Sequence, residues 1–212
     1  MFLGYGFLLT FGNDGGIFVC GGSGGVAALR RRVDRVGAVV LGFAAACSGG
    51  IIRDVLIGAL PPDNIRSWKP LAISSAAVAV TLVFYPSITS RLRNPVQVFD
   101  AVGLGLFAVL GADKAMAYGI GPLWSVLLGV TTSIGGGVVR DVLLARVPGV
   151  LRSEIYATAA LLGAAILVIG RQFGLWPDSY GVLLGAGACI LVRLLALYFG
   201  WQLPLPIRHR KP

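Results

Sequence analysis

The amino-acid sequence predicts an all-α integral membrane protein with seven transmembrane helices, arranged as two inverted three-helix repeats plus a final helix. Of its 212 residues, 56% are hydrophobic and 13% are charged, and the mean hydropathy is +0.83. A soluble domain carries about a quarter charged residues. The apolar runs are continuous and long enough for the roughly 20 residues of a membrane-crossing helix. Strands of a membrane barrel would instead alternate apolar and polar residues.

The inverted arrangement is predicted by an internal repeat with a constant offset of 87 residues. Residues 48–56 read SGGIIRDVL, and residues 135–143 read GGGVVRDVL. The same offset superposes Gly42 on Gly129 and Pro61 on Pro148. Because the offset spans three helices, equivalent helices would cross the membrane in opposite directions, as in many transport proteins with a site near the midplane.

The first three spans are expected at residues 3–29, 36–60 and 70–90. The first is rich in glycine, which lets helices approach closely in lipid, and it ends at an arginine run. The second contains the first glycine motif and stops at Pro61, since proline cannot continue a helix. Pro86 inside the third predicts a kink or an early end.

The other four spans are expected at residues 96–118, 123–145, 154–170 and 179–199. Ser153 and Glu154 suit the start of the sixth helix. The chain is interpreted as one transmembrane domain over residues 1–212. Its parts are a first repeat at 1–93, a second at 94–171, a seventh helix at 178–201 and a basic cytoplasmic tail at 202–212.

Lysine and arginine are unevenly divided between the two sides of the expected membrane. Eleven fall on one side: Arg30, Arg31, Arg32, Arg35, Arg91, Arg93, Arg146, Arg152, Arg208, Arg210 and Lys211. Three fall on the other: Arg66, Lys69 and Arg171. The positive-inside rule then predicts a multi-pass inner-membrane protein with its N-terminus outside and its C-terminus in the cytoplasm. Anionic lipid headgroups on the cytoplasmic side explain the net charge of +9 better than nucleic acid does.

The glycines of the two motifs are the first candidates for a functional site. They are Gly49, Gly50, Gly135, Gly136 and Gly137. Successive glycines can bend a membrane helix and free carbonyl groups to coordinate a cation. They can also simply allow two helices to touch. Because the motif is duplicated near the middle of two inverted helices, we favour the bend.

Hydroxyl groups precede both glycine motifs and could line a pore. They belong to Ser48, Thr131, Thr132 and Ser133. Hydroxyls in membrane helices ordinarily donate to the preceding turn. No ring of carboxylates is evident within the spans, so potassium or sodium is favoured over a divalent ion.

Charged residues within the expected spans are the third group of candidates. They are Arg53, Asp54, Asp100, Lys114, Arg140 and Asp141. A charge inside the bilayer costs at least about 2.5 kcal/mol, so each needs a partner or water. Neighbours on a helix point about 100° apart, so the partners of the Arg-Asp pairs are expected on other helices. Asp100 could pair with Arg140 or Lys114. Two interpretations stay open, a charged lining or gate and an ion pair that fixes the fold.

Enzymatic and metal chemistry find no support in the sequence. There is no GxSxG, HExxH or P-loop motif. The single His209 lies in the tail, and the three cysteines are isolated without CxxC spacing. The chain is therefore expected to have no catalytic residues, no metal site and no cofactor.

The paired Gly-Gly-x-x-Arg-Asp motifs, with residues 102–115 and 154–163, resemble the prokaryotic trimeric intracellular cation (TRIC) channels over about residues 13 to 204. The resemblance implies a homotrimer with one pore per protomer. Each pore would conduct mainly potassium through bent second and fifth transmembrane helices, with Lys114 and the Arg-Asp pairs near the pathway. Two positions depart from the repeat, Ser48 against Gly135 and Cys20 against Phe107. The alternative is a secondary transporter of a small zwitterion or amino acid, because inverted repeats and broken helices also serve alternating access. A scaffold without transport is the third class.

Overall fold

The structure is a computed structural model that describes the chain except residues 1, 93, 152–153 and 202–212. The predicted basic tail therefore lies outside the described residues, as do Arg93, Arg152 and the start of the sixth helix at Ser153. The described residues form eight α-helices and one short 3-10 helix. These are α1 (Phe2–Arg30), α2 (Arg35–Leu56), α3 (Asp63–Arg66), α4 (Lys69–Arg91), α5 (Pro95–Ala117), α6 (Pro122–Leu143), η1 (Gly149–Leu151), α7 (Glu154–Gln172) and α8 (Asp178–Phe199).

A helix occupies each of the seven predicted positions, and the largest difference is the end of α2. This helix stops at Leu56 rather than residue 60, because Gly58 adopts a left-handed φ of +73° and the Ala59 N–H donates to the Asp54 carbonyl at 2.8 Å. The end of α6 repeats this turn 87 residues later. Ala145 has a φ of +51°, and the Arg146 N–H donates to the Asp141 carbonyl at 2.9 Å. The bounds of α2 and α6 thus differ by 87 at both ends.

Six of the described helices are long and apolar enough to cross a membrane, namely α2, α4, α5, α6, α7 and α8. The chain is therefore an all-helical membrane protein, and the prediction of membrane spans is confirmed for six of the seven. Helix α1 is not among the six, although it is long, because Asn13, Asp14 and many glycines lower its hydropathy.

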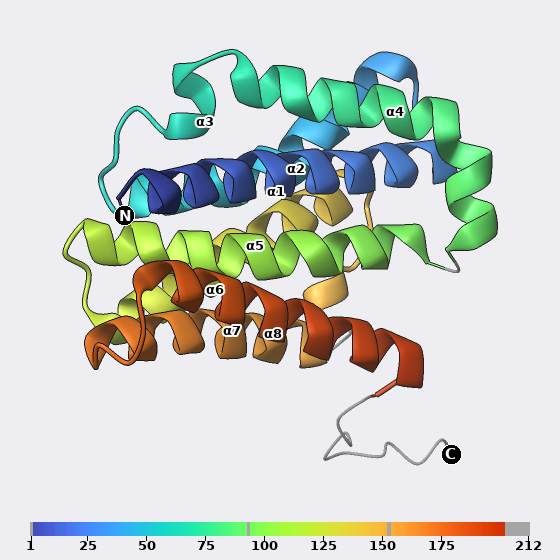
Figure 1. The fold of residues 1–212 in the computed structure, drawn as a ribbon. Helices are drawn as coiled ribbons and strands as arrows, with labels where there is room; N and C mark the ends of the chain where they lie inside the picture. Colours follow the sequence, from blue (N-terminus) through green and yellow to red (C-terminus); the bar gives the residue numbers. More distant parts are fainter. Residues whose placement is uncertain (1, 93, 152–153, 202–212) are drawn as a thin grey trace, which may run out of the picture.

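Helices α1 and α5 lie side by side through the middle of the bundle (Figure 1). In the most apolar 18-residue stretch of α5, 61% is buried, against 22% to 44% in the corresponding stretches of the other five spans. The two helices touch at two glycines. A Cβ built on Gly16 would lie 2.8 Å from the Phe107 ring, and one built on Gly103 would meet the Cys20 sulfur. Cys20 and Phe107, which occupy equivalent positions in the two repeats but differ in size, thus each face a glycine. This explains how both side chains are accommodated between α1 and α5.

Helix α4 continues through Pro86 to Arg91, and its ribbon turns sharply near this end (Figure 1). The predicted kink is therefore confirmed, and the early end is not. A proline inside a helix removes one hydrogen bond and crowds the preceding turn. The Thr89 hydroxyl donates to the Tyr85 carbonyl at 2.8 Å beside the kink.

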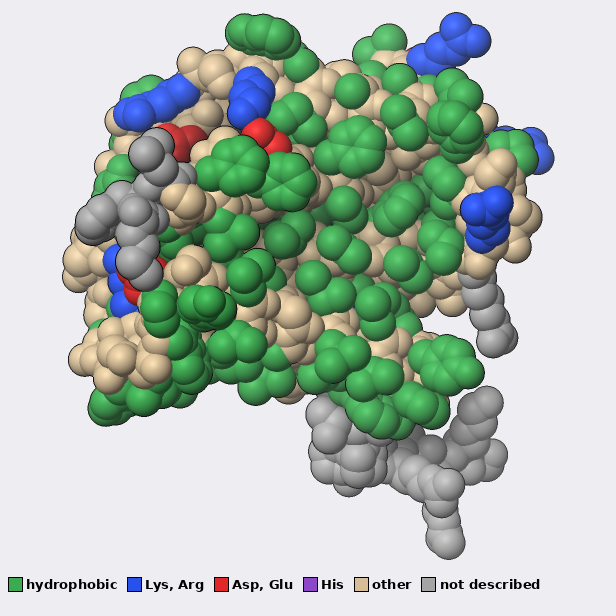
Figure 2. Space-filling model, in the orientation of Figure 1, with side chains coloured by type: hydrophobic (Ala, Val, Ile, Leu, Met, Phe, Trp, Pro, Cys, Tyr) green, Lys and Arg blue, Asp and Glu red, His purple; other side chains and the backbone are tan. Residues whose placement is uncertain are grey.

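The surface is apolar around the middle of the bundle and charged at its ends. Figure 2 shows hydrophobic side chains across the central part of one face, with Lys, Arg, Asp and Glu toward its margins. Many large apolar side chains are exposed along the long helices, among them Phe11, Val83, Leu183 and Leu191. Apolar side chains exposed on several long helices suit contact with lipid rather than water.

Candidate functional site

The glycine motifs meet where α2 crosses α6. A Cβ built on Gly49 would fall on the Thr132 carbonyl oxygen, and one built on Gly136 would fall on the Ala45 carbonyl oxygen. One built on Gly135 would lie 2.8 Å from the Gly49 Cα. The backbones therefore touch directly, and only glycine fits here. Both helices remain α-helical through the motifs, so the helix-contact interpretation describes these residues, and the bends stay a prediction.

The second glycine of the first motif and the third of the second admit a polar side chain against the helix. Asn64 on α3 donates from its amide nitrogen to the Cys47 carbonyl at 3.0 Å, and a Cβ on Gly50 would lie 2.7 Å from that nitrogen. A Cβ built on Gly137, which is 87 residues after Gly50, would lie 3.3 Å from the Tyr156 hydroxyl. Each half therefore brings one polar group to its glycine motif, Asn64 from the short α3, which the sequence did not predict, and Tyr156 from α7.

The four candidate hydroxyls bond within their own helices. Ser48 donates to the Ala44 carbonyl at 2.6 Å, and Thr131 and Thr132 donate to carbonyls four residues earlier at 2.9 and 2.6 Å. Ser133 donates to the Val130 carbonyl at 2.8 Å. These are the ordinary bonds to the preceding turn. A pore lined by these hydroxyls stays a prediction.

At the end of α2, four charged residues form the Lys114 cluster, which consists of Arg53, Asp54, Asp63 and Lys114. The Lys114 ammonium lies 2.8 Å from the Asp54 carboxylate and 2.5 Å from that of Asp63. Asp54 is 1% exposed, whereas Asp63 is 57% exposed. The second oxygen of Asp54 accepts the backbone N–H of Asp63 at 3.0 Å. Lys114 thus joins the buried end of α2 to the loop that follows it.

At the end of α6, a second group forms the Arg140 cluster, which consists of Ser23, Asp100, Arg140 and Asp141. The buried Arg140 guanidinium donates to Asp100 at 2.6 Å and to Asp141 at 2.9 Å, and it also contacts the Ser23 hydroxyl. Ser23 donates to Asp100 at 2.6 Å. Asp141 accepts the Gly149 N–H at 3.0 Å. Of the two partners considered for Asp100, the structure therefore selects Arg140.

The Arg-Asp neighbours, whose partners were expected on other helices, also pair with each other. Arg53 donates through two nitrogens to Asp54 at 2.9 and 2.8 Å, and Arg140 does the same to Asp141 at 3.0 and 2.9 Å. A long arginine side chain can fold back across the 100° between neighbouring helix positions. The expected partners on other helices are present as well, through Lys114 and Asp100.

The two clusters lie at opposite ends of α5. Asp100 and Lys114 are 14 positions apart on this helix, which corresponds to about 21 Å at 1.5 Å per residue. The crossing of α2 and α6 lies between them. The arrangement therefore has a charged group at each end and a tight helix contact in the middle.

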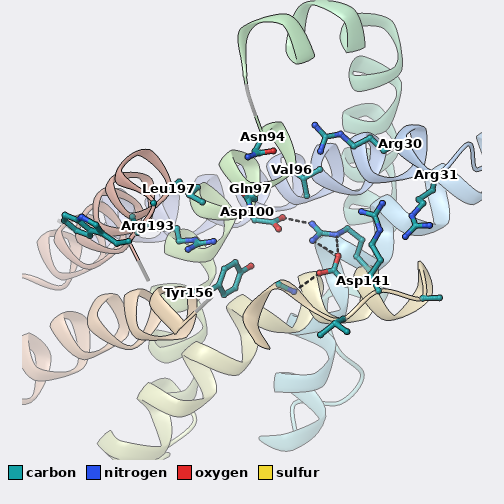
Figure 3. A pocket seen from close by; sticks show the side chains of 18 residues that line it. Arg30, Arg31, Asn94, Val96, Gln97, Asp100, Asp141, Tyr156, Arg193 and Leu197 are labelled. Atoms are coloured by element: carbon teal, nitrogen blue, oxygen red, sulfur yellow. Dashed lines mark hydrogen bonds and ion pairs between the residues drawn. The ribbon is translucent and has the colours of Figure 1, made fainter. Parts of the chain in front are cut away.

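A cavity of about 780 Å³ opens beside the Arg140 cluster. The ends of α1, α6 and α8 and the starts of α5 and α7 surround it. Arg140 and the two carboxylates that it binds, Asp100 and Asp141, form its floor. Figure 3 shows Arg193 and Tyr156 on one side and Arg30 and Arg31 on another. The Arg193 guanidinium lies over the Tyr156 ring, 4.9 Å from its centroid. A smaller void shares this floor and reaches Ile134 and Gly137, so the cavity leads toward the second glycine motif.

Several polar residues in or beside these clusters were missed by sequence reasoning. Ser23 lies in a glycine-rich run, and Asp63 and Asn64 lie in a polar loop, so their surroundings resembled ordinary packing and solvated turn. Asp113 was noted only as a neighbour of Lys114. Its carboxylate accepts hydrogen bonds from Tyr5 at 2.6 Å and Arg171 at 2.7 Å. Pairing over more than 50 residues leaves no local pattern in one sequence.

Comparison with solved structures defines the class of this protein. The chain matches the TRIC trimeric intracellular cation channel orthologue from Rhodobacter sphaeroides with a TM-score of 0.86 and 35% identity, covering 91% of this chain and 98% of that one. The fold is thus that of a membrane protein of the TRIC class, and the resemblance predicted from the sequence is confirmed.

The particular family is shown by a sequence model described as Glycine transporter, which matches residues 14–86 and 97–172. The chain belongs to this family. Among its relatives, the UPF0126 membrane protein SCO4104 of Streptomyces coelicolor is 43% identical over 196 residues, covering 92% of this chain and 89% of the relative. The UPF0126 inner membrane protein YadS of Escherichia coli is 34% identical over 184 residues, covering 87% and 88%. The two matched segments correspond to the two halves of the chain.

Proposed function

We propose that this protein is a monovalent cation channel, mainly for potassium and less selectively for sodium, without enzymatic activity. It works as a homotrimer in an inner membrane, with one pore per protomer. The observation that carries the proposal is the match to a TRIC cation channel over nearly the whole chain. Buried charges at both ends of a membrane-spanning bundle support it, since such residues mark ion and solute paths in membrane proteins.

The proposed path runs along α2 and α6, the second and fifth of the predicted spans. Its support is the cavity beside Arg140, the adjoining void that reaches Gly137, and the polar Lys114 cluster at the far end of α5. The contacts of Gly49 and Gly136 leave no room for an ion between the two helices. Conduction therefore requires α2 and α6 to separate at the crossing, and this geometry corresponds to a closed path.

Inverted repeats are supported by the order of contacts at two crossings. Between α2 and α6, Ala45 contacts Gly136 and Gly49 contacts Thr132. A later residue on α2 therefore contacts an earlier residue on α6, so the two helices are antiparallel at the crossing. The contacts of Gly16 with Phe107 and Cys20 with Gly103 follow the same rule between α1 and α5. At each crossing the offset of 87 converts one contact into the other, because it relates Ala45 to Thr132 and Gly49 to Gly136, and likewise Gly16 to Gly103 and Cys20 to Phe107.

We include α1 as the seventh span, with the N-terminus outside and the C-terminus in the cytoplasm. Helix α1 starts at one end of the bundle and α8 finishes at the other (Figure 1), as an odd number of crossings requires. The arginines of the α1–α2 loop lie at the end that the positive-inside rule assigns to the cytoplasm. Anionic lipid headgroups on that side are the proposed lipid partners.

A second candidate function is a carrier for glycine or another small zwitterion. The description of the family model favours it, and charged groups on both sides of a closed crossing would also suit alternating access. The two candidates differ in kinetics, because a carrier must rearrange for each solute and therefore saturates, whereas an open pore passes ions in discrete conductance steps.

The experiment that tests the proposal is transport by the purified protein in liposomes. Potassium flux would be measured against a valinomycin control for vesicle integrity, with single-channel recording and uptake of labelled glycine on the same preparation. Discrete steps carried by potassium support the channel. Saturable glycine uptake without such steps contradicts it and supports the carrier, and silence in all three assays from folded protein contradicts both.

A further inference from the structure

The space beside Gly50 and the space beside Gly137 occupy equivalent places in the two halves of the chain. The two glycines are related by the offset of 87. A Cβ built on Gly50 would lie 3.9 Å from a guanidinium nitrogen of Arg53, and one built on Gly137 would lie 4.0 Å from the same nitrogen of Arg140. Each glycine and the arginine three residues later thus border one space, and these spaces are the Gly50 notch and the Gly137 notch.

The Gly137 notch borders open space. Gly137, Arg140 and Tyr156 line the small void that adjoins the cavity of about 780 Å³. The Tyr156 hydroxyl beside this notch belongs to α7, a helix of 19 residues, and Tyr156 is 7% exposed. Close packing holds a buried side chain on a long helix in place. This notch is therefore reached from the cavity without movement of Tyr156.

The Gly50 notch is filled by the Asn64 amide. A Cβ built on Gly50 would lie 2.7 Å from the amide nitrogen, and this nitrogen donates to the Cys47 carbonyl at 3.0 Å. The amide therefore occupies the place that corresponds to the border of the void in the other half. It also covers a backbone carbonyl oxygen, the kind of group that replaces the water around a cation in selective channels.

The short helix that carries Asn64 can move at small cost. Helix α3 has four residues and lies in the connection between α2 and α4 (Figure 1). Three of the four are exposed and Asn64 is half-buried, so little apolar surface holds the helix. The Asp63 N–H donates to Asp54 at 3.0 Å, and the Asp63 carboxylate, which pairs with Lys114, is 57% exposed. Segments with few buried contacts open at a low free energy.

We propose that Asn64 closes the path at the Lys114 end, and that α3 lifts out of the Gly50 notch when the path opens. The inference rests on the proposed function and adds the residue that controls access from this end. While the Asn64 amide fills the notch, neither water nor a cation reaches the Cys47 carbonyl. When α3 lifts, that carbonyl faces the path. Closure at this end thus depends on a hydrogen bond from a short, exposed segment, whereas closure at the crossing depends on backbone contact between two long helices.

The test combines two substitutions that break the same contact. Asn64→Ala removes the amide. Gly50→Ala places a methyl group 2.7 Å from the amide nitrogen, so this flexible side chain must leave the notch. The matched control is Ile65→Ala on the same short helix, because Ile65 is 57% exposed. Single-channel recording and potassium flux in liposomes would compare the full-length wild type, these three variants and the double variant Asn64→Ala with Gly50→Ala. Melting temperatures would show which variants are folded.

Asn64→Ala and Gly50→Ala are each expected to raise the open probability about two- to tenfold, the effect of losing one hydrogen bond of ordinary strength. Ile65→Ala is expected to keep the wild-type value. Because both substitutions break one contact, the double variant is expected to match the stronger single variant and not the product of the two effects.

Two failures of this test have different meanings. A conducting wild type with the same open probability in both single variants would overturn the role of Asn64 and leave the proposed channel standing. Effects that multiply in the double variant would also overturn it, since Asn64 and Gly50 would then act independently. Silence of the wild type and of every folded variant would contradict the proposed channel itself, and the closure by Asn64 with it.

Discussion

The contact between the two glycine motifs predicts a measurable cost for a single added methyl group. In Gly135→Ala, the new Cβ would lie 2.8 Å from the Gly49 Cα, whereas ordinary contact begins at 3.4 Å. Helices α2 and α6 must therefore move apart, by about 0.6 Å to restore ordinary contact, and overpacking of this kind costs about 1–3 kcal/mol. For a chain of this length that corresponds to a fall in melting temperature of roughly 2–12 °C.

The matched control is Gly187→Ala on α8, where nothing lies within 4 Å of the added Cβ. Both substitutions gain the helix preference of alanine, about 0.5–1 kcal/mol, so their difference isolates the steric effect. Thermal unfolding in detergent gives the first readout. If Gly135→Ala melts at the temperature of Gly187→Ala, the proposed backbone contact is absent.

The same pair of variants tests where the path is closed. A wedge that holds α2 and α6 apart weakens the contact that blocks an ion, so potassium flux per protein is expected to rise in Gly135→Ala and to stay unchanged in Gly187→Ala. A lower melting temperature with wild-type flux would show that the crossing is structural and does not control permeation.

Three further pairs of substitutions test the clusters and the helix ends. Lys114→Met should lower the unfolding free energy by roughly 3 kcal/mol, because it removes a partner of the buried Asp54. Lys69→Met breaks the more exposed pair with Asp14 and should lower the unfolding free energy by less than about 1 kcal/mol. Equal losses in chemical denaturation would contradict this prediction. Asp100→Asn keeps the shape of the side chain but leaves Arg140 only one carboxylate. It should therefore lower the melting temperature more than Asp63→Asn, which weakens the exposed ion pair of the Lys114 cluster. The reverse order would show that burial does not set the strength of these pairs. Ala145→Gly should raise the unfolding free energy by up to about 1 kcal/mol, because alanine is strained at positive φ, and Gly58→Ala should lower it by a similar amount. Both changes would be measured by calorimetry. The same sign for both would refute the left-handed turn that ends α2 and α6 alike.

The long helices were predictable because their cause is local. Each needs about 20 apolar residues, and prolines, arginines or glycines mark most ends, so six helices were placed to within two residues at each end. The exception at Leu56 depends on Gly58 in a left-handed turn, which a continuous apolar run through Leu60 conceals. The four-residue helix α3 is too short to show any periodicity.

Most charged members of the two clusters were predictable, Asp63 being the exception, but their pairing was not. A buried charge must have a partner, and this rule correctly singled out Asp54, Lys114 and Arg140. Which partner each one finds depends on how α1, α5 and α6 are rotated about their axes, which one sequence with an internal repeat does not determine. The same limit explains why Ser23 and Asn64 were missed.

The internal repeat determines the glycine contacts in both halves but not the charges around them. Asp100 corresponds to Asn13 at the offset of 87, and Lys114 corresponds to Ala27. The Arg140 cluster therefore has a second carboxylate from α5, held by an arginine that is 4% exposed, whereas the Lys114 cluster depends partly on Asp63, which is 57% exposed. Exposed ion pairs separate at little cost, and buried ones leave an uncompensated charge when broken. The two similar halves thus have ion pairs of unequal strength at their ends. The Lys114 cluster should therefore separate before the Arg140 cluster, and the comparison of Asp100→Asn with Asp63→Asn measures that difference.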